Sequence, residues 1–199
     1  MIPTEDNYAD WLSCAAGRYL RRRGWSFFSV SIGQVREAGF PVDKLFLVGN
    51  KIVGIQLKRP LNPPANRTGY EYGYSQRQHN EMLNAARSSI FYALPHSVDY
   101  RDQHRMHRSV RFYEAHEVEP LTASKMRPYQ DAGLNFFEFV KGIKACPIGQ
   151  KIPAGFTFST FLALAQRFPT FAFLVINLEG KTAFMIRIKK TQLGEPLSD

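Results

Sequence analysis

The chain has 199 residues, 44% of them hydrophobic, and a formal net charge of +9 at neutral pH. This length suits one domain with a buried core, and no stretch approaches the roughly 18 uninterrupted apolar residues that a membrane span needs. There is no basic start followed by an apolar stretch, as in a secretory signal, and Cys14 and Cys146 are too few for a disulfide framework. We therefore expect a cytoplasmic protein, and its excess of positive charge predicts a polyanionic partner, of which nucleic acid is the simplest.

The first predicted element is a helix that begins after Thr4 and ends near Gly24. Its apolar positions follow helical spacing: Tyr8, Trp11, Leu12, Ala15, Ala16, Tyr19 and Leu20. Among the acids of this helix only Glu5 leans toward the apolar face, about 40° from its centre at 100° per residue. A glutamate in the first turn also favours the helix dipole, so Glu5 is either a helix-start charge or a residue of a site.

The next predicted element is a strand at residues 25–32 (WSFFSVSI), where side chains alternate with period two. Residues 33–40 form a connection that contains Glu37. Glu37 is therefore the alternative to Glu5 as an acid of a site. It is either a loop acid in water or an acid that turns inward beside the hairpin that follows.

Two apolar runs, at residues 45–48 and 52–57, are separated by Gly49-Asn50, which is a hairpin signal. If Val48 pairs with Lys51, the register places Asp43 opposite Gln56. Directly opposed side chains in an antiparallel pair have Cβ atoms roughly 4.5–5.5 Å apart, so both can contact one metal ion. Both faces of this hairpin are apolar, which predicts a position in the middle of a covered sheet.

Period-two alternation puts Lys58 on the same face as Gln56, so a carboxylate, an amide and a lysine converge at one end of the sheet. The Asp43 and Gln56 oxygens are hard ligands of the kind that Mg²⁺ or Mn²⁺ prefers, and Lys58 is suited to orient or deprotonate a water molecule. The alternative is a turn aspartate, a strand-end glutamine and a solvated lysine with no shared role.

Residues 59–75 are rich in Pro, Gly, Asn and Tyr, which predicts a loop. Tyrosines alternate there with arginines that suit stacking on bases and contact with phosphates: Tyr70, Tyr72, Tyr74, Arg59, Arg67 and Arg77. An equally good interpretation of the sequence is that these tyrosines pack on the body of the protein. A capping box from Ser75 to Gln78 then predicts a helix with Met82, Leu83 and Ala86 inward, before a strand at residues 89–94.

The pattern Pro41-x-Asp43 followed by Gln56-x-Lys58 resembles the signature of the PD-(D/E)XK nuclease superfamily, with Gln in place of the second acid. The predicted order over residues 1–95, helix, three strands, helix and strand, is similar to the core of that superfamily. Among its branches, virus-type replication-repair nuclease domains and Holliday-junction-resolvase-like nucleases are the most similar.

The resemblance implies a restriction-endonuclease-like fold with a mixed central sheet and divalent-metal chemistry. It implies Asp43, Gln56 and Lys58 as catalytic residues, and Asp43, Gln56 and Glu5 as ligands of Mg²⁺ or Mn²⁺, with Glu37 as the alternative acid. Gln78 matches a glutamine that such nucleases place near the scissile phosphate, although its role in the capping box explains it equally well.

Residues 96–155 form a polar, basic insertion that contains His96, His104, His107 and His116. Without a nearby cysteine or a helical i, i+4 histidine pair, a basic surface for nucleic acid, with Arg105 and Arg108, is favoured over a zinc site. Residues 156–199 are expected to form a helix around residues 158–167 and a hairpin that extends the sheet or covers one of its faces.

The sequence as a whole predicts a single α/β domain that acts as a metal-dependent nuclease, with DNA as its substrate and a role in replication, repair or recombination. The alternative is a non-catalytic nucleic-acid-binding protein with the same fold. A third reading is an interaction module whose basic face binds an acidic protein, and a homodimer is compatible with all three.

Overall fold

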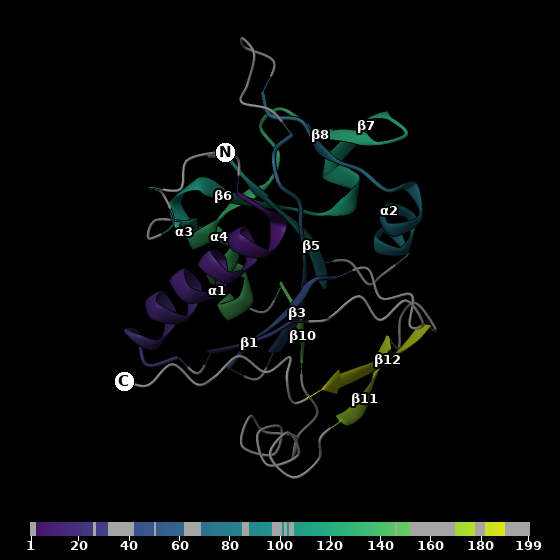
Figure 1. Cartoon of the computed structure of the whole chain (residues 1–199). Helices are drawn as coiled ribbons and strands as arrows, with labels where there is room; N and C mark the ends of the chain where they lie inside the picture. The colour runs from purple at the N-terminus through teal and green to yellow at the C-terminus, as the bar shows by residue number, and fades with distance from the viewer. Residues whose placement is uncertain are drawn as a thin grey trace.

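The computed structural model describes residues 3–25, 27–31, 42–49, 51–61, 69–84, 88–96, 101, 103, 106–145, 147–151, 170–177 and 182–189. These residues form a mixed α/β structure, as predicted, in which helices lie on both sides of a mixed sheet (Figure 1). Within the described part of the chain, no helix is both long enough and apolar enough to cross a membrane.

Seven of the described strands form the central sheet. They are β1 (Phe27–Ser31), β2 (Lys44–Val48), β3 (Lys51–Leu57), β5 (Ile90–Pro95), β6 (Val110–Tyr113), β9 (Leu134–Asn135) and β10 (Gln150–Lys151). Their order is β1-β2-β3-β5-β6-β9, and β10 pairs with the start of β3. The β3–β5 pair is parallel and the other pairs are antiparallel, so the chain must cross over between β3 and β5.

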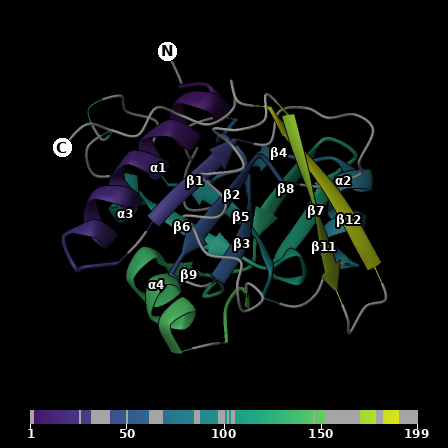
Figure 2. The ribbon, with the colours of Figure 1, turned by 90° about the horizontal axis from the view of Figure 1, so that it is seen from below.

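Helices cover the sheet on two sides, which we call the α1 face and the α2 face (Figure 2). The α1 face is covered by α1 (Glu5–Arg21), α3 (Met106–Ser109) and α4 (Phe136–Ala145). The α2 face is covered by α2 (Gln76–Leu83), by the short helix η3 (Ala115–Glu117) and by a small sheet of β4 (Tyr72–Gly73), β8 (Lys125–Pro128) and β7 (Val118–Thr122). Each face has its own buried apolar cluster, as expected for a sheet covered on both sides.

The start of α1 is set by its cap, as predicted. The Thr4 hydroxyl accepts a hydrogen bond from the Asn7 backbone N–H at 3.2 Å, and the Asn7 side chain accepts from the Thr4 backbone N–H at 3.1 Å. Five of the seven predicted apolar positions of α1 are buried, and Trp11 and Tyr19 are packed against the same cluster. The packing of this apolar face fixes α1 on the sheet. It thereby also fixes the position of Glu5, the first residue of the helix.

The predicted hairpin and its register are confirmed. Val48 pairs with Lys51 and Lys44 with Ile55, and the Asp43 N–H donates to the Ile55 carbonyl at 2.9 Å. Gly49 has a φ of 59°, a conformation that glycine adopts without strain, which explains the tight turn. The observed order α1, β1, β2, β3, α2 and β5, with only the two-residue β4 added, also agrees with the predicted order.

The start of β3 is covered by a segment from much later in the chain. β10 pairs with Lys51 and Ile52 of β3, and the Lys51 ammonium, almost fully buried, donates to the Ile148 carbonyl at 3.0 Å. Gly149 approaches the same strand so closely that a Cβ there would lie 2.7 Å from the Val53 side chain. β3 therefore pairs with β2 over residues 51–55 on one side, and with β10 and then β5 on the other side.

Some sequence expectations need correction. Leu83 was expected inside but is 49% exposed, because α2 ends there and only His79 and Met82 are buried in it. The C-terminal hairpin pairs as predicted, β11 (Thr170–Asn177) with β12 (Thr182–Lys189), but it forms a two-stranded sheet of its own and does not extend the central sheet. The predicted helix at residues 158–167 lies outside the described residues.

The segment expected to be a polar insertion contributes to the central structure. β6 pairs with β5, and Met106, Val110 and Phe112 belong to the cluster on the α1 face. In β6 the apolar residues of this segment alternate with polar ones. The segment therefore has a polar composition overall, and that composition did not indicate a strand.

Candidate metal and nucleic-acid site

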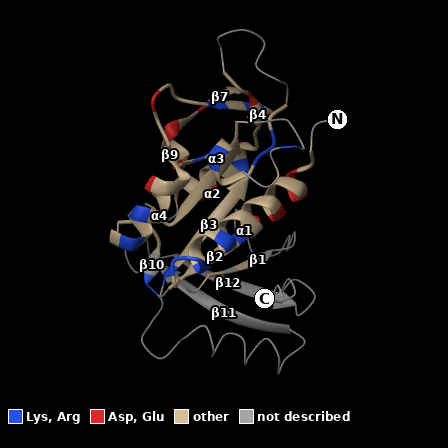
Figure 3. Ribbon diagram, turned by 90° about the vertical axis from the view of Figure 1, so that its left-hand side faces the viewer, with Lys and Arg blue, Asp and Glu red and all other residues tan. Residues whose placement is uncertain are grey.

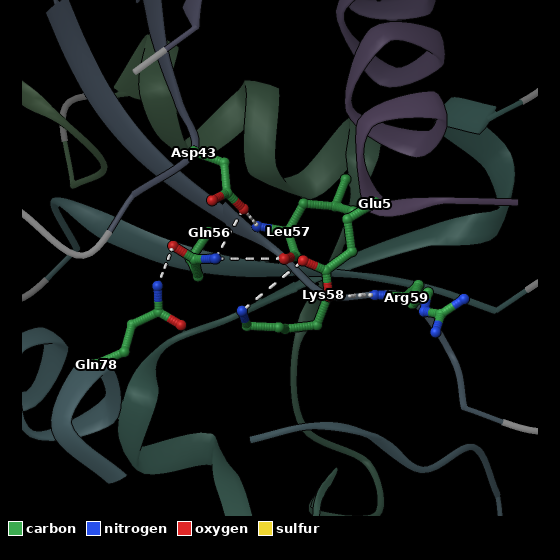
Figure 4. Close-up of polar contacts among 7 residues, drawn as sticks. All are labelled: Glu5, Asp43, Gln56, Leu57, Lys58, Arg59 and Gln78. Carbon is green, nitrogen blue, oxygen red and sulfur yellow. Dashed lines mark hydrogen bonds and ion pairs between the residues drawn. The ribbon is translucent and has the colours of Figure 1, made fainter. Parts of the chain in front are cut away.

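The candidate site begins at Asp43, directly before β2, and its carboxylate faces Gln56 as predicted. Asp43 Oδ2 accepts a hydrogen bond from Gln56 Nε2 at 2.7 Å and another from the Leu57 backbone N–H at 2.8 Å (Figure 4). Both donors come from the last residues of β3. The hairpin register therefore fixes the position of this carboxylate.

Gln56 is only 1% exposed, and both ends of its amide are hydrogen bonded. Its Nε2 donates to Asp43, and the Leu57 carbonyl oxygen lies 3.4 Å from the same nitrogen. Its Oε1, which the sequence suggested as a metal ligand, accepts from Gln78 Nε2 at 2.9 Å. The amide nitrogen, not the oxygen, therefore faces Asp43 in this structure.

Gln78 lies in the first turn of α2, and its side chain contacts Gln56. Ser75 is the N-cap residue, but its side chain makes no capping hydrogen bond. The capping-box prediction is therefore wrong, and the Gln78 side chain reaches across to β3 instead. The parallel β3–β5 crossover brings the start of α2 over the carboxyl end of β3, where ligand sites of open α/β sheets occur.

Glu5 and Lys58 complete the group from the other side. Glu5 Oε1 accepts from the Arg59 backbone N–H at 3.4 Å, and Glu5 Oε2 lies 4.0 Å from Lys58 Nζ. The Lys58 side chain is 14% exposed and that of Glu5 41%, so this is a loose ion pair at the border of solvent. The structure thus brings Glu5 to the site, whereas Glu37 lies outside the described residues.

Burial dominates the electrostatics of Asp43 and raises the pKa of its carboxyl above the ordinary value. The Lys58 ammonium and the Leu57 N–H lower this pKa, Glu5 raises it and the Gln56 amide lowers it, but the effect of burial prevails. An ionised Asp43 is consequently held at an energetic cost. A bound cation would relieve that cost.

The donor atoms fit a hard divalent cation with one rearrangement. The described residues contain no group of three His, Cys, Asp or Glu side chains that could hold a metal, so Glu5 and Asp43 need further oxygen ligands. Turning the Gln56 amide exchanges its oxygen and nitrogen and presents Oε1 beside Asp43 and the Leu57 carbonyl. Gln78 can then turn its own amide and accept from Gln56, so both amides stay hydrogen bonded.

The residues predicted to bind nucleic acid differ in their exposure and in their pairing. Arg59, Arg77 and Arg108 are exposed, although Arg77 Nε is paired with Glu81 Oε1 at 3.0 Å. Lys and Arg residues are spread over several elements, among them α3 and α4 (Figure 3). Arg67 and Arg105 lie outside the described residues.

The stacking role predicted for Tyr72 is wrong. Tyr72 is fully buried in β4, and its hydroxyl donates to the Pro95 carbonyl at 2.9 Å. Burial also raises the pKa of Tyr72, so the hydroxyl remains protonated. The alternative, packing on the body of the protein, is what the structure shows for Tyr72 and for the buried Tyr74.

Sequence reasoning missed a row of residues that continues from the site across the α2 face. Gln56 pairs with Tyr92 of β5, and Tyr92 pairs with Tyr113 of β6. The His79 ring lies nearly parallel to the Tyr92 ring, and His96 Nε2 is 3.2 Å from the Tyr113 hydroxyl. The tyrosines within the apolar strands β5 and β6 were the available signal, but without the strand order they could not be placed in one row.

The part of the site described above is formed by residues from α1, β3, α2 and the residue before β2, which is a constellation defined by the fold and not by one local motif. The chain matches no protein-family model, and no curated protein shows significant similarity to it.

Proposed function

We propose that this protein is a divalent-metal-dependent nuclease with a restriction-endonuclease-like core, related to the PD-(D/E)XK nucleases, and that DNA is its substrate. One observation carries the proposal. Asp43, Glu5 and the pair Gln56 and Lys58 come from three separate parts of the chain and meet at the carboxyl end of β3, where the hairpin register holds Asp43 against Gln56 and Leu57.

The residues divide the work according to their chemistry. Asp43, Glu5 and the Gln56 amide oxygen would hold Mg²⁺ or Mn²⁺, which supplies an activated water and neutralises charge on the phosphate. Lys58, little exposed and next to Glu5, holds a proton near the attacking water and stabilises negative charge. Gln78, whose amide now donates to the Gln56 oxygen, would turn with the Gln56 amide and accept from its nitrogen, so that the Gln56 oxygen stays directed at the metal.

The net charge of +9 supports a polyanionic substrate. Exposed Arg59 follows Lys58 directly and is suited to bind a phosphate beside the reacting one. Binding should weaken steeply as salt rises, because each neutralised phosphate releases counterions. An affinity that stayed constant between low and physiological salt would contradict a nucleic-acid partner.

A second function, nucleic-acid binding without catalysis, is favoured by one observation. Gln56 replaces an acid, and both ends of its buried amide are already hydrogen bonded within the protein. A site with acids at both strand positions would carry one more negative charge than this site does. The missing charge weakens the attraction of the site for a cation.

Cleavage of plasmid and branched DNA at low salt, with Mg²⁺, Mn²⁺ or chelator, separates the two functions. The parent protein should cut only with metal, and Lys58→Met should lose this activity. Lys125→Met is the matched control, because Lys125 is a half-exposed lysine paired with Glu71 in the small sheet. Salt-sensitive DNA binding with no cleavage under any metal would favour the non-catalytic function.

A further inference from the structure

A cavity of about 340 Å³ opens on the α2 face beyond the carboxyl end of β5, and none of its lining residues belongs to the Asp43–Gln56 site. Its main lining residues are Tyr70, His96, Arg111, Tyr113, Tyr129 and Asp131. Small-ligand sites span roughly 300–1000 Å³, so this cavity has room for one small molecule or one nucleotide unit and not for a duplex.

The aromatic wall of the cavity is held in place on several sides. The Tyr113 and His96 rings are within 13° of parallel and share a 3.2 Å hydrogen bond, and the Tyr70 ring crosses His96 at 64° with centroids 5.6 Å apart. Gly133 lies so close to the Tyr113 ring that a Cβ at residue 133 would clash with it. A pre-positioned aromatic wall of this kind suits stacking of a planar base.

The charges in the cavity favour a ligand with one anionic group. Arg111 is exposed and makes no ion pair with any residue that the structure describes, whereas Arg127 is paired with Glu119 at 3.0 Å. Burial, assisted by the Arg111 charge, lowers the pKa of His96 to about 4, so this ring is neutral at pH 7. Asp131 opposes a second anionic group and suits an amino donor on a base.

The cavity is also well placed relative to the candidate site. Tyr113 continues the row that begins with Asp43 and Gln56 and passes through Tyr92. Two strand spacings separate β3 from β6, which corresponds to about 10 Å between Gln56 and Tyr113. A strand bound at Asp43 can therefore extend to the cavity within a few nucleotides.

We propose that this cavity binds one unpaired nucleotide, with its base against the partly exposed His96 and Tyr70 rings and its phosphate at Arg111. Tyr113, only 2% exposed, holds the His96 ring in place through their hydrogen bond. The ligand chemistry is a purine or pyrimidine base that carries a single phosphate, and it has two sources: an unpaired nucleotide within a nucleic-acid strand, or a free nucleoside monophosphate. In the first case the cavity gives the proposed nuclease a preference for DNA with an unpaired nucleotide near the cut, a consequence that rests on the proposed function.

Fluorescence of 2-aminopurine tests the proposal in the full chain with chelator present, because the fluorescence is quenched when the base stacks. The probes are an oligonucleotide duplex with one unpaired 2-aminopurine and the free 2-aminopurine nucleoside monophosphate. We expect quenching of the duplex probe, and Arg111→Ala should weaken this binding about tenfold or more, as for loss of a charge-assisted hydrogen bond. Quenching of the free nucleotide alone would identify a free nucleotide as the ligand.

Arg22→Ala is the matched control, since it removes an exposed arginine that does not line the cavity, and it should change affinity by about twofold or less. Tyr129→Ala, at a residue that is 50% exposed, should also weaken binding without loss of the fold, which thermal melts would check. Absence of quenching with both probes, or equal effects of Arg111→Ala and Arg22→Ala, would overturn the proposal. Because no metal is present, a failure of DNA cleavage would leave this result standing, and a failure here would leave cleavage to be judged separately.

Discussion

Both faces of the central sheet are buried, but their buried side chains differ in chemistry. On the α1 face, Phe112 is stacked on Phe139 with ring centroids 3.9 Å apart, within a cluster of aliphatic and aromatic side chains. On the α2 face, the row of Gln56, Tyr92 and Tyr113 carries polar groups that are matched by partners from α2 and from the end of β5. Successive side chains of a strand point to opposite faces of the sheet. The α1 face is therefore packed with apolar side chains, whereas the α2 face carries the hydrogen-bonded polar groups.

Phe112 and its neighbour Tyr113 give the sharpest test of this difference. Phe112→Ala should lower the free energy of unfolding by about 3–5 kcal/mol, as expected for a large buried aromatic side chain. Tyr113→Phe keeps the ring and should cost only about 1 kcal/mol, the net value of one hydrogen bond. Chemical denaturation of the two variants measures both changes, and similar losses would show that the α2 face is as important for cohesion as the α1 face.

Asp43→Asn should separate activity from stability at a single residue of the α2 face. Metal-supported DNA cleavage should fall about a hundredfold or more, a change of at least about 2.7 kcal/mol in the activation barrier. Stability in chelator should stay the same or rise, because burial raises the pKa of Asp43 and the ionised carboxylate therefore destabilises the folded state at neutral pH.

Cleavage assays and thermal melts of Asp43→Asn answer the two questions independently. Normal cleavage would remove Asp43 from the metal site. A large loss of stability would instead make this carboxylate a structural residue, held for its hydrogen bonds to Gln56 and Leu57.

Gln56→Glu tests whether the amide stands in for an acid. A second carboxylate would replace the 2.7 Å hydrogen bond to Asp43 by repulsion, so stability in chelator should fall by about 1–2 kcal/mol. Added Mn²⁺ should restore it, since the new acid is also a better ligand. Gln56→Ala, in contrast, should lower metal affinity.

Thermal melts of the parent protein and the two Gln56 variants, with and without Mn²⁺, measure these effects. Equal metal-induced shifts in all three proteins would mean that Gln56 is not a ligand. A Glu variant as stable as the parent in chelator would argue that residues 43 and 56 do not meet.

His96 should give the α2 face a modest sensitivity to acid. Burial lowers the pKa of His96 to about 4 in the folded protein, whereas the ordinary value is about 6.5. As pH falls below 6.5 the unfolded chain binds a proton that the folded protein does not, so His96 alone should lower the free energy of unfolding by about 1.4 kcal/mol between pH 8 and pH 5.5.

Denaturation of His96→Gln across this pH range should show a smaller loss of the free energy of unfolding than the parent protein shows. His79 and His107, whose pKa values burial also lowers, will leave part of the slope in the variant. An unchanged slope in His96→Gln would mean that His96 does not lie buried and neutral at the cavity.

The sequence was most informative where local geometry decides the outcome. A two-residue turn leaves only one pairing for Val48 and Lys51, and every further pair in the hairpin follows from it, including the meeting of Asp43 and Gln56. The cap at Thr4 and the apolar stripe of α1 are local in the same sense. Glu5 was placed correctly on the inward side, but its contact with Lys58 required the packing of α1 on the sheet.

The failures arose where a distant contact overrides local composition. Alternating tyrosines in a Pro- and Gly-rich stretch suggested an exposed loop, yet the alternation puts Tyr72 in β4, where a bond to Pro95 and pairing with β8 bury it. Gln78 fitted a capping box, but the crossover from β3 to β5 offered it a buried amide instead. Neither partner is visible within the local window of sequence.

The pairing of β10 with the start of β3 has a consequence for the order of folding. Lys51 and Ile148 are separated by 97 residues, so the first half of β3 has an open backbone edge on that side until the chain beyond residue 148 has been made. Open edges are templates for association with other chains. During synthesis, folding of this strand should therefore be delayed, or the strand should be bound by a chaperone, until residues 147–151 have been made. A chain truncated before residue 147 should aggregate and not form a smaller soluble domain.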